Sequence, residues 1–252
     1  MVEEYSRLKR TSMKIIKKIE NKQDFYNYPT PTIAFLGDSV THGCFECYEK
    51  SKGVIDTYYE IKNGYPTKLK EQLNKLYPAS HINIINAGLS GDNATNALNR
   101  LERDVLAYNP DLCVVSFQLN DSMSGLQGLE KYKESLDKIF KELKKRNIEI
   151  IFLTENMMCT YVSKSLDNEL LKAIAEQCAE IENSGVAKKY RDAALEVCKQ
   201  NEVKVCDIYS MWQKMKENGE DVTELLSNKI NHPSRESHPV IAKELIKVMM
   251  SD

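Results

Sequence analysis

The sequence lacks long apolar runs and an excess of charge of either sign. None of its apolar stretches approaches the roughly 20 residues that a membrane-spanning helix needs. The 35 Lys and Arg residues nearly balance the 37 Asp and Glu residues, which gives a formal net charge of -2. A nucleic-acid-binding domain normally carries a strongly basic face. We therefore expect neither stable membrane insertion nor nucleic acid as a partner.

Linkers rich in Gly, Pro or Ser are also missing, as are internal repeats and low-complexity segments. We therefore expect a single domain over residues 1–252, long enough to bury a core without disulfide or metal staples. The N-terminus has neither the uninterrupted apolar core nor the small-residue cleavage site of a secretory signal. The cysteines number seven, an odd count, so we expect reduced thiols in a cytoplasmic protein.

Residues at about 1–22 are rich in Lys and Arg and show the periodicity of a helix. Leu8, Ile15, Ile16 and Ile19 could form its buried stripe, so we expect a helical extension of the domain. A helix packed on the domain, with a solvated basic face, is the favoured interpretation. A helix that binds a membrane surface or a partner is the alternative.

Short runs rich in β-branched residues alternate with longer segments of helical periodicity. The runs predict strands at residues 32–36, 82–86, 112–117, 148–154 and 203–208. The longer segments predict helices at 65–76, 93–108, 129–146, 168–200 and 239–249, with a break at Ser184-Gly185. This alternation predicts an α/β protein, a three-layer α/β/α sandwich around a central five-stranded parallel sheet.

Small and polar residues follow the predicted strands, at the edge of such a sheet where ligands bind. They are Gly37-Asp38-Ser39, the stretch from Asn86 to Asn93, Gln118-Leu119-Asn120-Asp121 and Thr154-Glu155-Asn156. Each has an ordinary structural explanation as well. Ser39 could cap a helix, and the glycines of the second group could supply positive φ angles in a turn. Asp38, Glu155 and Asn156 are our candidates for residues of a substrate pocket.

In this order, the groups resemble the conserved blocks of the SGNH/GDSL hydrolases, a family of esterases and acylhydrolases. Gly37-Asp38-Ser39 matches the first block, and the stretch from Asn86 to Asp92 matches the second. Gln118-Leu119-Asn120-Asp121 matches the third block with glutamine in place of glycine, and His232-Pro233 with His238 matches the last. The resemblance covers nearly the whole chain. It implies a flavodoxin-like fold and a serine ester hydrolase that needs no cofactor and no metal.

The resemblance assigns roles to four residues. Ser39 would be the nucleophile, and His232 would take its proton as the general base. The oxyanion hole would consist of the backbone N–H groups of Ser39 and Gly91 and the side-chain amide of Asn120. Glycine at position 91 would allow close approach, because no Cβ would stand between its N–H and the substrate.

The chain departs from the family where the triad acid is expected. That acid lies three residues before the histidine, and here Lys229 occupies the position. We therefore expect a Ser39–His232 dyad whose imidazole is oriented by a main-chain carbonyl near Lys229 or Ile230. An acid from elsewhere, Glu155 or Glu224, is the alternative.

Two other kinds of site fit the sequence less well. Cys44 and Cys47, with His42 just upstream, have ligand-like spacing, but a structural zinc site needs four ligands and no second close pair exists. A dinucleotide or phosphate site would need a glycine-rich cradle after the first strand. The sequence there is not G-x-G-x-x-G, and Asp38 would repel phosphate.

The expected substrate is a small acyl ester, with acetyl on a carbohydrate preferred. The segment after Ser39 looks like that of carbohydrate-esterase members of the family, and residues 41–48 would line one wall of the pocket. Phe45, Tyr48 and Tyr161 could stack on a sugar ring or simply pack. The partner would thus be a small-molecule or oligosaccharide ester, and a homo-oligomer is left open. The alternatives are a lysophospholipase or thioesterase, and a catalytically silent ligand-binding relative.

Overall fold

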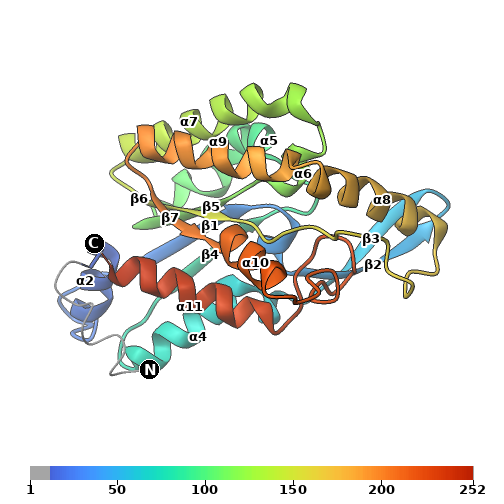
Figure 1. The fold of residues 1–252 in the computed structure, drawn as a ribbon. Coiled ribbons are helices and arrows are strands. Elements are labelled where there is room, and N and C mark those ends of the chain that lie inside the picture. Colours follow the sequence, from blue (N-terminus) through green and yellow to red (C-terminus); the bar gives the residue numbers. More distant parts are fainter. Residues whose placement is uncertain (1–11, 252) are drawn as a thin grey trace.

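A five-stranded parallel sheet lies between two layers of helices in the structure, a computed structural model that describes residues 12–251 (Figure 1). The strands are β1 (Thr32–Gly37), β4 (Asn83–Gly88), β5 (Leu112–Ser116), β6 (Glu149–Thr154) and β7 (Lys204–Asp207). They are ordered β4-β1-β5-β6-β7, and every neighbouring pair is parallel. The α/β sandwich and all five strands predicted from the sequence are confirmed.

The strand order reverses at β1, which is the switch point of the sheet. From β1 the chain crosses to β4 on one side and then returns to β5 on the other. The connections therefore diverge at the carboxyl ends of β1 and its neighbours, where open α/β sheets bind ligands. Gly37, the last residue of β1, lies opposite Gly88 of β4 and Ser116 of β5. The loops that follow these three strands therefore begin side by side.

Each face of the sheet has its own layer of helices and its own apolar core (Figure 1). One layer consists of α5 (Ala94–Asp104), α7 (Leu129–Lys145) and α9 (Val186–Gln200). The other contains α2 (Lys14–Asn21), α4 (Tyr65–Leu76), α10 (Ile208–Glu217) and α11 (Ser237–Met250). Buried residues of β1 alternate between the two cores: Ala34 and Leu36 face the first layer, and Ile33 and Phe35 face the second.

The remaining elements are short or lie outside the two layers. Helix α8 (Glu169–Asn183) ends where the break was expected, and Gly185 adopts a φ of 77° before α9 begins. The short helices are α3 (Ser39–His42), α6 (Leu119–Ser122), and the 3-10 turns η1 (Ile61–Asn63), η2 (Leu106–Tyr108) and η3 (Leu126–Gly128). Helix α5 ends earlier than the expected 93–108 helix, because Val105 leaves the helical conformation, and the turn η2 follows it.

The sequence analysis missed an antiparallel hairpin of β2 (Cys44–Ser51) and β3 (Val54–Tyr59). Lys52 and Gly53 form its two-residue turn, and Gly53 has a φ of 77°. The hairpin is separate from the central sheet and lies near α8 at one end of the molecule (Figure 1). Helix α10 was also missed, because it follows β7 directly with Asp207 as its N-cap.

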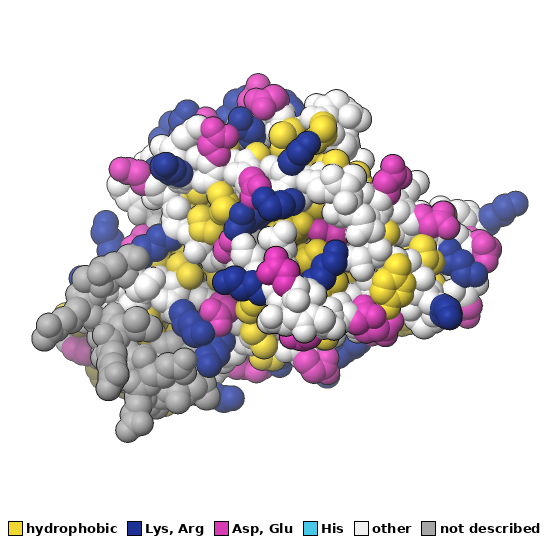
Figure 2. Space-filling model, in the orientation of Figure 1, with side chains coloured by type: hydrophobic (Ala, Val, Ile, Leu, Met, Phe, Trp, Pro, Cys, Tyr) yellow, Lys and Arg dark blue, Asp and Glu magenta, His cyan; other side chains and the backbone are white. Residues whose placement is uncertain are grey.

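Helix α2 is the described part of the expected N-terminal extension, and residues 1–11 lie outside the described residues. Ile15, Ile16 and Ile19 are buried, and Met13 donates a backbone hydrogen bond to Met249 of α11 at 3.0 Å. On the face that Figure 2 shows, Lys and Arg side chains are interspersed with Asp and Glu. Within residues 12–251, no helix combines the length and the apolar character needed to cross a bilayer.

Candidate active site

Ser39 is the first residue of α3, immediately after the turn that ends β1. The N-cap of this helix is Asp38, whose Oδ1 accepts a hydrogen bond from the backbone N–H of Val40 at 2.9 Å. Ser39 is therefore not the cap that its position suggested. Its side chain is only 4 % exposed, and α3 ends after four residues at Gly43 with a φ of 96°. Ser39 thus lies just past the carboxyl end of β1, an interior strand of the sheet.

The imidazole of His232 lies between the Ser39 hydroxyl and a main-chain carbonyl. Its Nε2 is 3.0 Å from Oγ of Ser39, and its Nδ1 is 2.6 Å from the carbonyl oxygen of Phe45. A carbonyl can only accept, so Nδ1 carries the proton and Nε2 is left to accept from the serine hydroxyl. Burial lowers the pKa of His232 to about 4, although the Phe45 carbonyl acts in the opposite direction. The ring is therefore neutral near pH 7.

The acceptor at Nδ1 lies elsewhere in the chain than we expected. It belongs to Phe45 in β2, rather than to Lys229 or Ile230, because the hairpin folds back against the histidine loop. Lys229 adopts a left-handed φ of 56° and turns its ammonium group to Glu224, at 2.9 Å. Glu224 is thus engaged by Lys229, and Glu155 contacts Asp38 instead of the imidazole.

Asn228 shapes the loop that carries His232. Its side-chain oxygen accepts hydrogen bonds from the backbone N–H groups of Ile230, Asn231 and His232 at 2.9–3.0 Å. Its Nδ2 donates to the side-chain oxygen of Asn231 at 2.9 Å and to the sulfur of Cys47 at 3.4 Å. One amide therefore fixes three consecutive backbone N–H groups of the loop that carries His232.

A cavity of about 380 Å³ opens at Ser39 and His232. Gly91 and Asn120, the other two residues expected in the oxyanion hole, also line it. Its remaining walls come from the hairpin, α8, the loop after β4 and the loop that carries His232. The residues are Cys47, Ile55, Asp56, Thr57, Tyr59, Ser90, Leu171, Ile174, Asn228, Ile230 and Asn231. The structure thus brings all four expected residues to one cavity, whose lining includes both polar and apolar side chains.

Gly91 has a left-handed φ of 78°, and a Cβ added there would meet no atom within 4 Å. The backbone conformation, together with the open space of the cavity, accounts for glycine at this position. Gly88 is constrained by the space around it rather than by a positive φ. An added Cβ would lie 2.3 Å from the backbone nitrogen of His42, so only glycine lets α3 pack against β4.

Asp38, Glu155 and Asn156 do not line the cavity, contrary to the expectation for a substrate pocket. All three are at least 97 % buried, covered by the loops that follow the strands. The carboxyl groups of Asp38 and Glu155 hydrogen-bond to each other. Burial raises the pKa of Asp38 to about 6, although its hydrogen bond with Glu155 acts in the opposite direction. Burial and the charge of Asp38 raise the pKa of Glu155 well above its usual range. The pair therefore shares a proton. Asn156 donates from Nδ2 to the backbone oxygen of Asn231 at 2.9 Å and so supports the histidine loop.

The buried carboxyl pair holds the segment that carries Asn120. Glu155 accepts the backbone N–H of Leu119 at 2.7 Å, and Asp38 accepts from Nδ2 of Asn120 at 3.1 Å. The same Nδ2 also donates to the backbone oxygen of Asp92 at 2.8 Å. Both protons of this amide thus have acceptors within the protein.

Arg100 and Asp92 form a buried ion pair that the sequence analysis missed. Arg100 of α5 contacts the Asp92 carboxylate at 2.6 Å and donates to the backbone oxygens of Ala87 at 2.7 Å and Gly37 at 3.1 Å. It therefore ties together the ends of β4 and β1. The available signal was an arginine on the apolar side of the 93–108 helical pattern.

The aromatic and sulfur residues near Ser39 have structural surroundings. Phe45 is fully buried, Tyr48 packs on Tyr58, and Tyr161 donates to Asp221 at 2.7 Å, so none of the three aromatics we considered lines the cavity. Of residues 41–48, which were expected to form one wall of the pocket, only Cys47 lines the cavity. From β3, Ile55, Asp56, Thr57 and Tyr59 line it. Within residues 12–251, no three His, Cys, Asp or Glu side chains are grouped to hold a metal ion, so His42, Cys44 and Cys47 do not form such a set.

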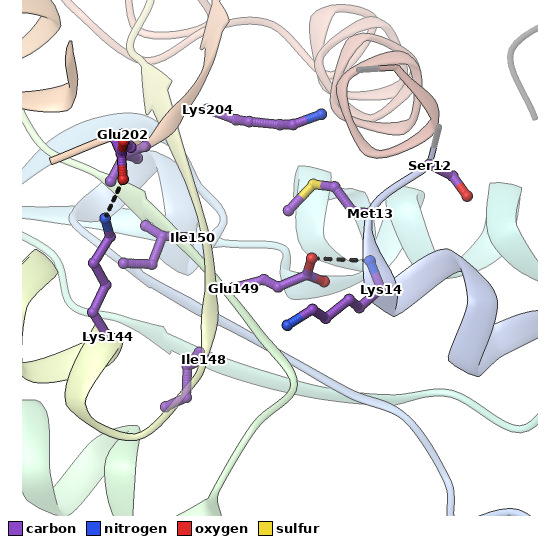
Figure 3. Close-up of a pocket in the computed structure, with 10 residues that line it drawn as sticks. Ser12, Met13, Lys14, Lys144, Ile148, Glu149, Ile150, Glu202 and Lys204 are labelled. Carbon is purple, nitrogen blue, oxygen red and sulfur yellow. Dashed lines mark hydrogen bonds and ion pairs between the residues drawn. The ribbon is translucent and has the colours of Figure 1, made fainter. Parts of the chain in front are cut away.

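A second cavity, of about 450 Å³, lies at the amino ends of β6 and β7 (Figure 3). It is lined by Ser12, Met13, Lys14, Lys144, Ile148, Glu149, Ile150, Glu202, Val203 and Lys204. Several of its charged groups have partners within the protein. Glu149 accepts the backbone N–H of Lys14 at 2.9 Å, and Lys144 lies 3.9 Å from Glu202. No base stands beside the hydroxyl of Ser12 among these residues.

Comparison with known proteins identifies the family. The model of the GDSL-like Lipase/Acylhydrolase family matches residues 35–239, a span that contains Ser39, Gly91, Asn120 and His232. The chain therefore belongs to the GDSL-like lipase/acylhydrolase family.

Individual relatives are more distant. An acetylxylan esterase from Geobacillus stearothermophilus is 29% identical over 89 residues, which span 35% of this chain and 39% of that protein. The crystal structure of the acetyl xylan esterase AlAXEase superimposes with a TM-score of 0.62 at 19% identity, over 85% of this chain and 98% of that one. A two-domain esterase active on acetylated mannans gives 0.64 at 17% identity, over 96% and 54%. These structures share the fold.

Proposed function

We propose that this protein is a serine esterase that hydrolyses a small acyl ester, an acetyl group on a carbohydrate, with Ser39 as nucleophile and His232 as base. The observation that carries the proposal is the position of one imidazole. Its Nε2 faces the Ser39 hydroxyl at 3.0 Å while the Phe45 carbonyl holds Nδ1 at 2.6 Å. A serine hydroxyl becomes a useful nucleophile when a neighbouring base of the correct tautomer can accept its proton.

In the first step, Oγ of Ser39 attacks the ester carbonyl carbon and its proton moves to Nε2 of His232. The imidazolium then carries hydrogen bonds at both nitrogens, to the reacting groups and to Phe45. The intermediate collapses, the leaving alcohol takes the proton from Nε2, and an acyl-enzyme remains. Water repeats the sequence: it gives a proton to Nε2, attacks the acyl group and releases Ser39.

The negative oxygen of the intermediate would be bound by the N–H groups of Ser39 and Gly91 and by the amide of Asn120. Both protons of that amide already have acceptors, Asp38 and the Asp92 carbonyl. The oxyanion must therefore share one N–H with an existing acceptor. A full negative charge competes well for such a donor, whereas a neutral ester carbonyl does not, so this donor favours the transition state over the bound substrate.

The cavity and the relatives support the proposed substrate class. About 380 Å³ of space, lined among others by Asp56, Thr57, Tyr59 and Ser90, suits an acyl group on a hydroxyl-rich alcohol. The relatives in sequence and in structure include esterases of acetylated xylan or mannan. Both observations support an acetylated carbohydrate.

The proposal is tested with p-nitrophenyl esters and three variants of the full chain. Ser39→Ala and His232→Ala should each lower kcat by at least about 10⁴-fold, because either change removes the nucleophile–base unit. Lys229→Ala should leave kcat within about two-fold, since its side chain points to Glu224 rather than to the imidazole. Unchanged turnover in Ser39→Ala would overturn the assignment, whatever His232→Ala does.

A panel of acyl lengths, from acetyl to octanoyl, then tests the substrate class. Acetyl and propionyl esters should be hydrolysed fastest, and release of acetate from acetylated xylooligosaccharide should depend on Ser39. Faster turnover of the long chains would favour the lysophospholipase or thioesterase alternative. No turnover of any ester by folded wild-type protein would favour the silent ligand-binding relative.

A further inference from the structure

The Phe45 ring is held between two residues of the loop and helix that follow His232. The guanidinium carbon of Arg235 lies 4.5 Å from the centroid of the ring, and the His238 ring packs at 5.0 Å. His238 is itself fixed, since its Nδ1 accepts the backbone N–H of Tyr65 at 3.0 Å. Phe45, whose carbonyl faces His232, is therefore clamped by Arg235 and His238, which lie three and six positions after His232.

Arg235 also bridges the two strands of the hairpin. Its two terminal nitrogens donate to the two oxygens of Glu46 at 2.6 Å and 2.8 Å, and its Nε donates to Glu60 at 3.1 Å. Glu46 directly follows Phe45, and Glu60 directly follows β3. Bidentate pairs of this kind fix orientation as well as distance. The three side chains are 30–39 % exposed, so the cluster is partly open to water and depends on its bidentate geometry rather than on burial.

The acceptor of the base needs such a support in this chain. Phe45 and His232 are 187 residues apart, and the hairpin is not hydrogen-bonded into the central sheet. An acid three residues before the histidine would be held by the same short loop. A carbonyl from a separate hairpin keeps its distance only if something fastens the hairpin to that loop. Arg235 makes the charged contacts between the two segments.

We propose that Arg235 is a positioning residue that, with Glu46 and Glu60, replaces the support of the missing triad acid by holding the Phe45 carbonyl against Nδ1 of His232. The proposal rests on the proposed function for its kinetic consequences but not for its geometry. Loss of the clamp lets the carbonyl retreat. The imidazole then loses its preference for the tautomer with a free Nε2, and the imidazolium formed during catalysis loses an acceptor.

The test compares Arg235→Met, which keeps an apolar stem on the ring, with Arg146→Met as matched control. Arg146 pairs with Glu102 on the surface at 3.1 Å, and neither residue lines the cavity at Ser39. In Arg235→Met we expect kcat to fall about 10- to 100-fold, a fraction of what a general base contributes, with KM within about three-fold. Arg146→Met should match wild type in both constants.

Two further readouts separate positioning from a general loss of stability. Imidazole ¹⁵N spectra should show Nδ1 protonated in wild type and a mixture of tautomers in Arg235→Met. The acid limb of kcat/KM should also move to lower pH, because the Phe45 carbonyl raises the pKa of His232 and its retreat removes that effect. Glu46, freed from Arg235, raises the same pKa, but it is the weaker of the two influences. The charged and titratable groups near the His232 imidazole and its clamp are Glu46, Glu60, Arg235, His238 and Cys47.

Each outcome decides the proposal. Wild-type kcat, tautomer and pH profile in Arg235→Met would overturn it, and so would a lower melting temperature with those three readouts unchanged. If Arg235→Met does not fold, Glu60→Gln takes its place. A smaller change in the same three readouts would then support the clamp, and the absence of any change would refute it. An inactive wild type would refute the proposed function alone, because the ¹⁵N spectra still report on the clamp.

Discussion

The two ends of the sheet treat their charged groups in opposite ways. At the amino end, carboxylates have partners: Glu149 accepts two backbone N–H groups at the start of α2, and Lys18 pairs with Asp111. At the carboxyl end, Asp38 and Glu155 face each other without a cation between them, and His232 is buried uncharged. The larger cavity lies at the amino end. Perturbed titratable groups, rather than cavity size, distinguish the candidate site.

The carboxyl end gathers buried carboxyl groups in the segments around Asn120. Asp92 is neutralised by Arg100, but burial also raises the pKa of Asp121 to about 7, with Asp38 and Asp92 contributing. Such an arrangement lowers stability, since each buried carboxyl must keep a proton or face a like charge. Its use here is that Asp38, Asp121 and Glu155 orient donors around Asn120. The comparison therefore predicts that equivalent changes at the two ends will have different effects.

The largest contrast should come from Asn120→Ala at the carboxyl end and Lys144→Ala at the amino end. Loss of one oxyanion donor lowers kcat by about 10²–10³-fold, so we expect that range for Asn120→Ala. Lys144 contacts only Glu202, at 3.9 Å, and its variant should keep wild-type turnover of p-nitrophenyl acetate. Equal activity in the two variants would remove Asn120 from the oxyanion hole.

A smaller effect is expected from the buried carboxyl pair. Glu155→Gln keeps a donor for Asp38 and an acceptor for the Leu119 N–H, so kcat should stay within about ten-fold of wild type. Glu155→Leu removes both and should lower kcat further and cost about 1–3 kcal/mol of unfolding free energy, measured in urea.

Glu149→Gln at the amino end is the matched control for this pair. It should alter stability by less than about 1 kcal/mol, as a change at a helix N-terminus does, and leave kcat unchanged. A loss of kcat in Glu149→Gln equal to that in Glu155→Leu would contradict the distinction between the two ends.

The smallest effect should be that of mild acid on turnover. The base must be neutral, and with a pKa of about 4 it remains so above that pH. At pH 5, wild type should keep about nine-tenths of its kcat/KM, whereas a histidine with the ordinary pKa of about 6.5 would leave only a few per cent. Activity should then fall as the pH drops through about 4. An acid limb centred near 6.5 would show that the imidazole is solvated.

The sequence predicts the central sheet well and the hairpin poorly, for a physical reason. Strands such as β1 and β5 are buried on both faces and read as continuous apolar runs. The strands β2 and β3 are largely exposed and mix Glu, Lys and Tyr, so they lack that pattern. Side-chain motifs indicated Ser39, Gly91, Asn120 and His232. The Phe45 carbonyl could not be found this way, because every residue has one.

The positions of Asp38, Glu155 and Asn156 illustrate a second limit. Polar residues after parallel strands were expected to face a ligand, and the structure places these three behind the cavity wall. Sequence patterns locate the end of a strand but not the depth of the side chain that follows. Lys229 shows the same limit, since its left-handed backbone directs the side chain to Glu224.

The main-chain acceptor at His232 gives the imidazole a partner that no side-chain replacement at position 45 itself can delete. A triad carboxylate disappears with a single nucleotide change, and it gains a proton in strong acid. A peptide oxygen persists through any substitution at Phe45 and does not titrate. Inherited loss of this contact would have to come from displacement of the whole hairpin. Among relatives that lack the acid, the hairpin is therefore the feature to examine before a sequence is dismissed as inactive.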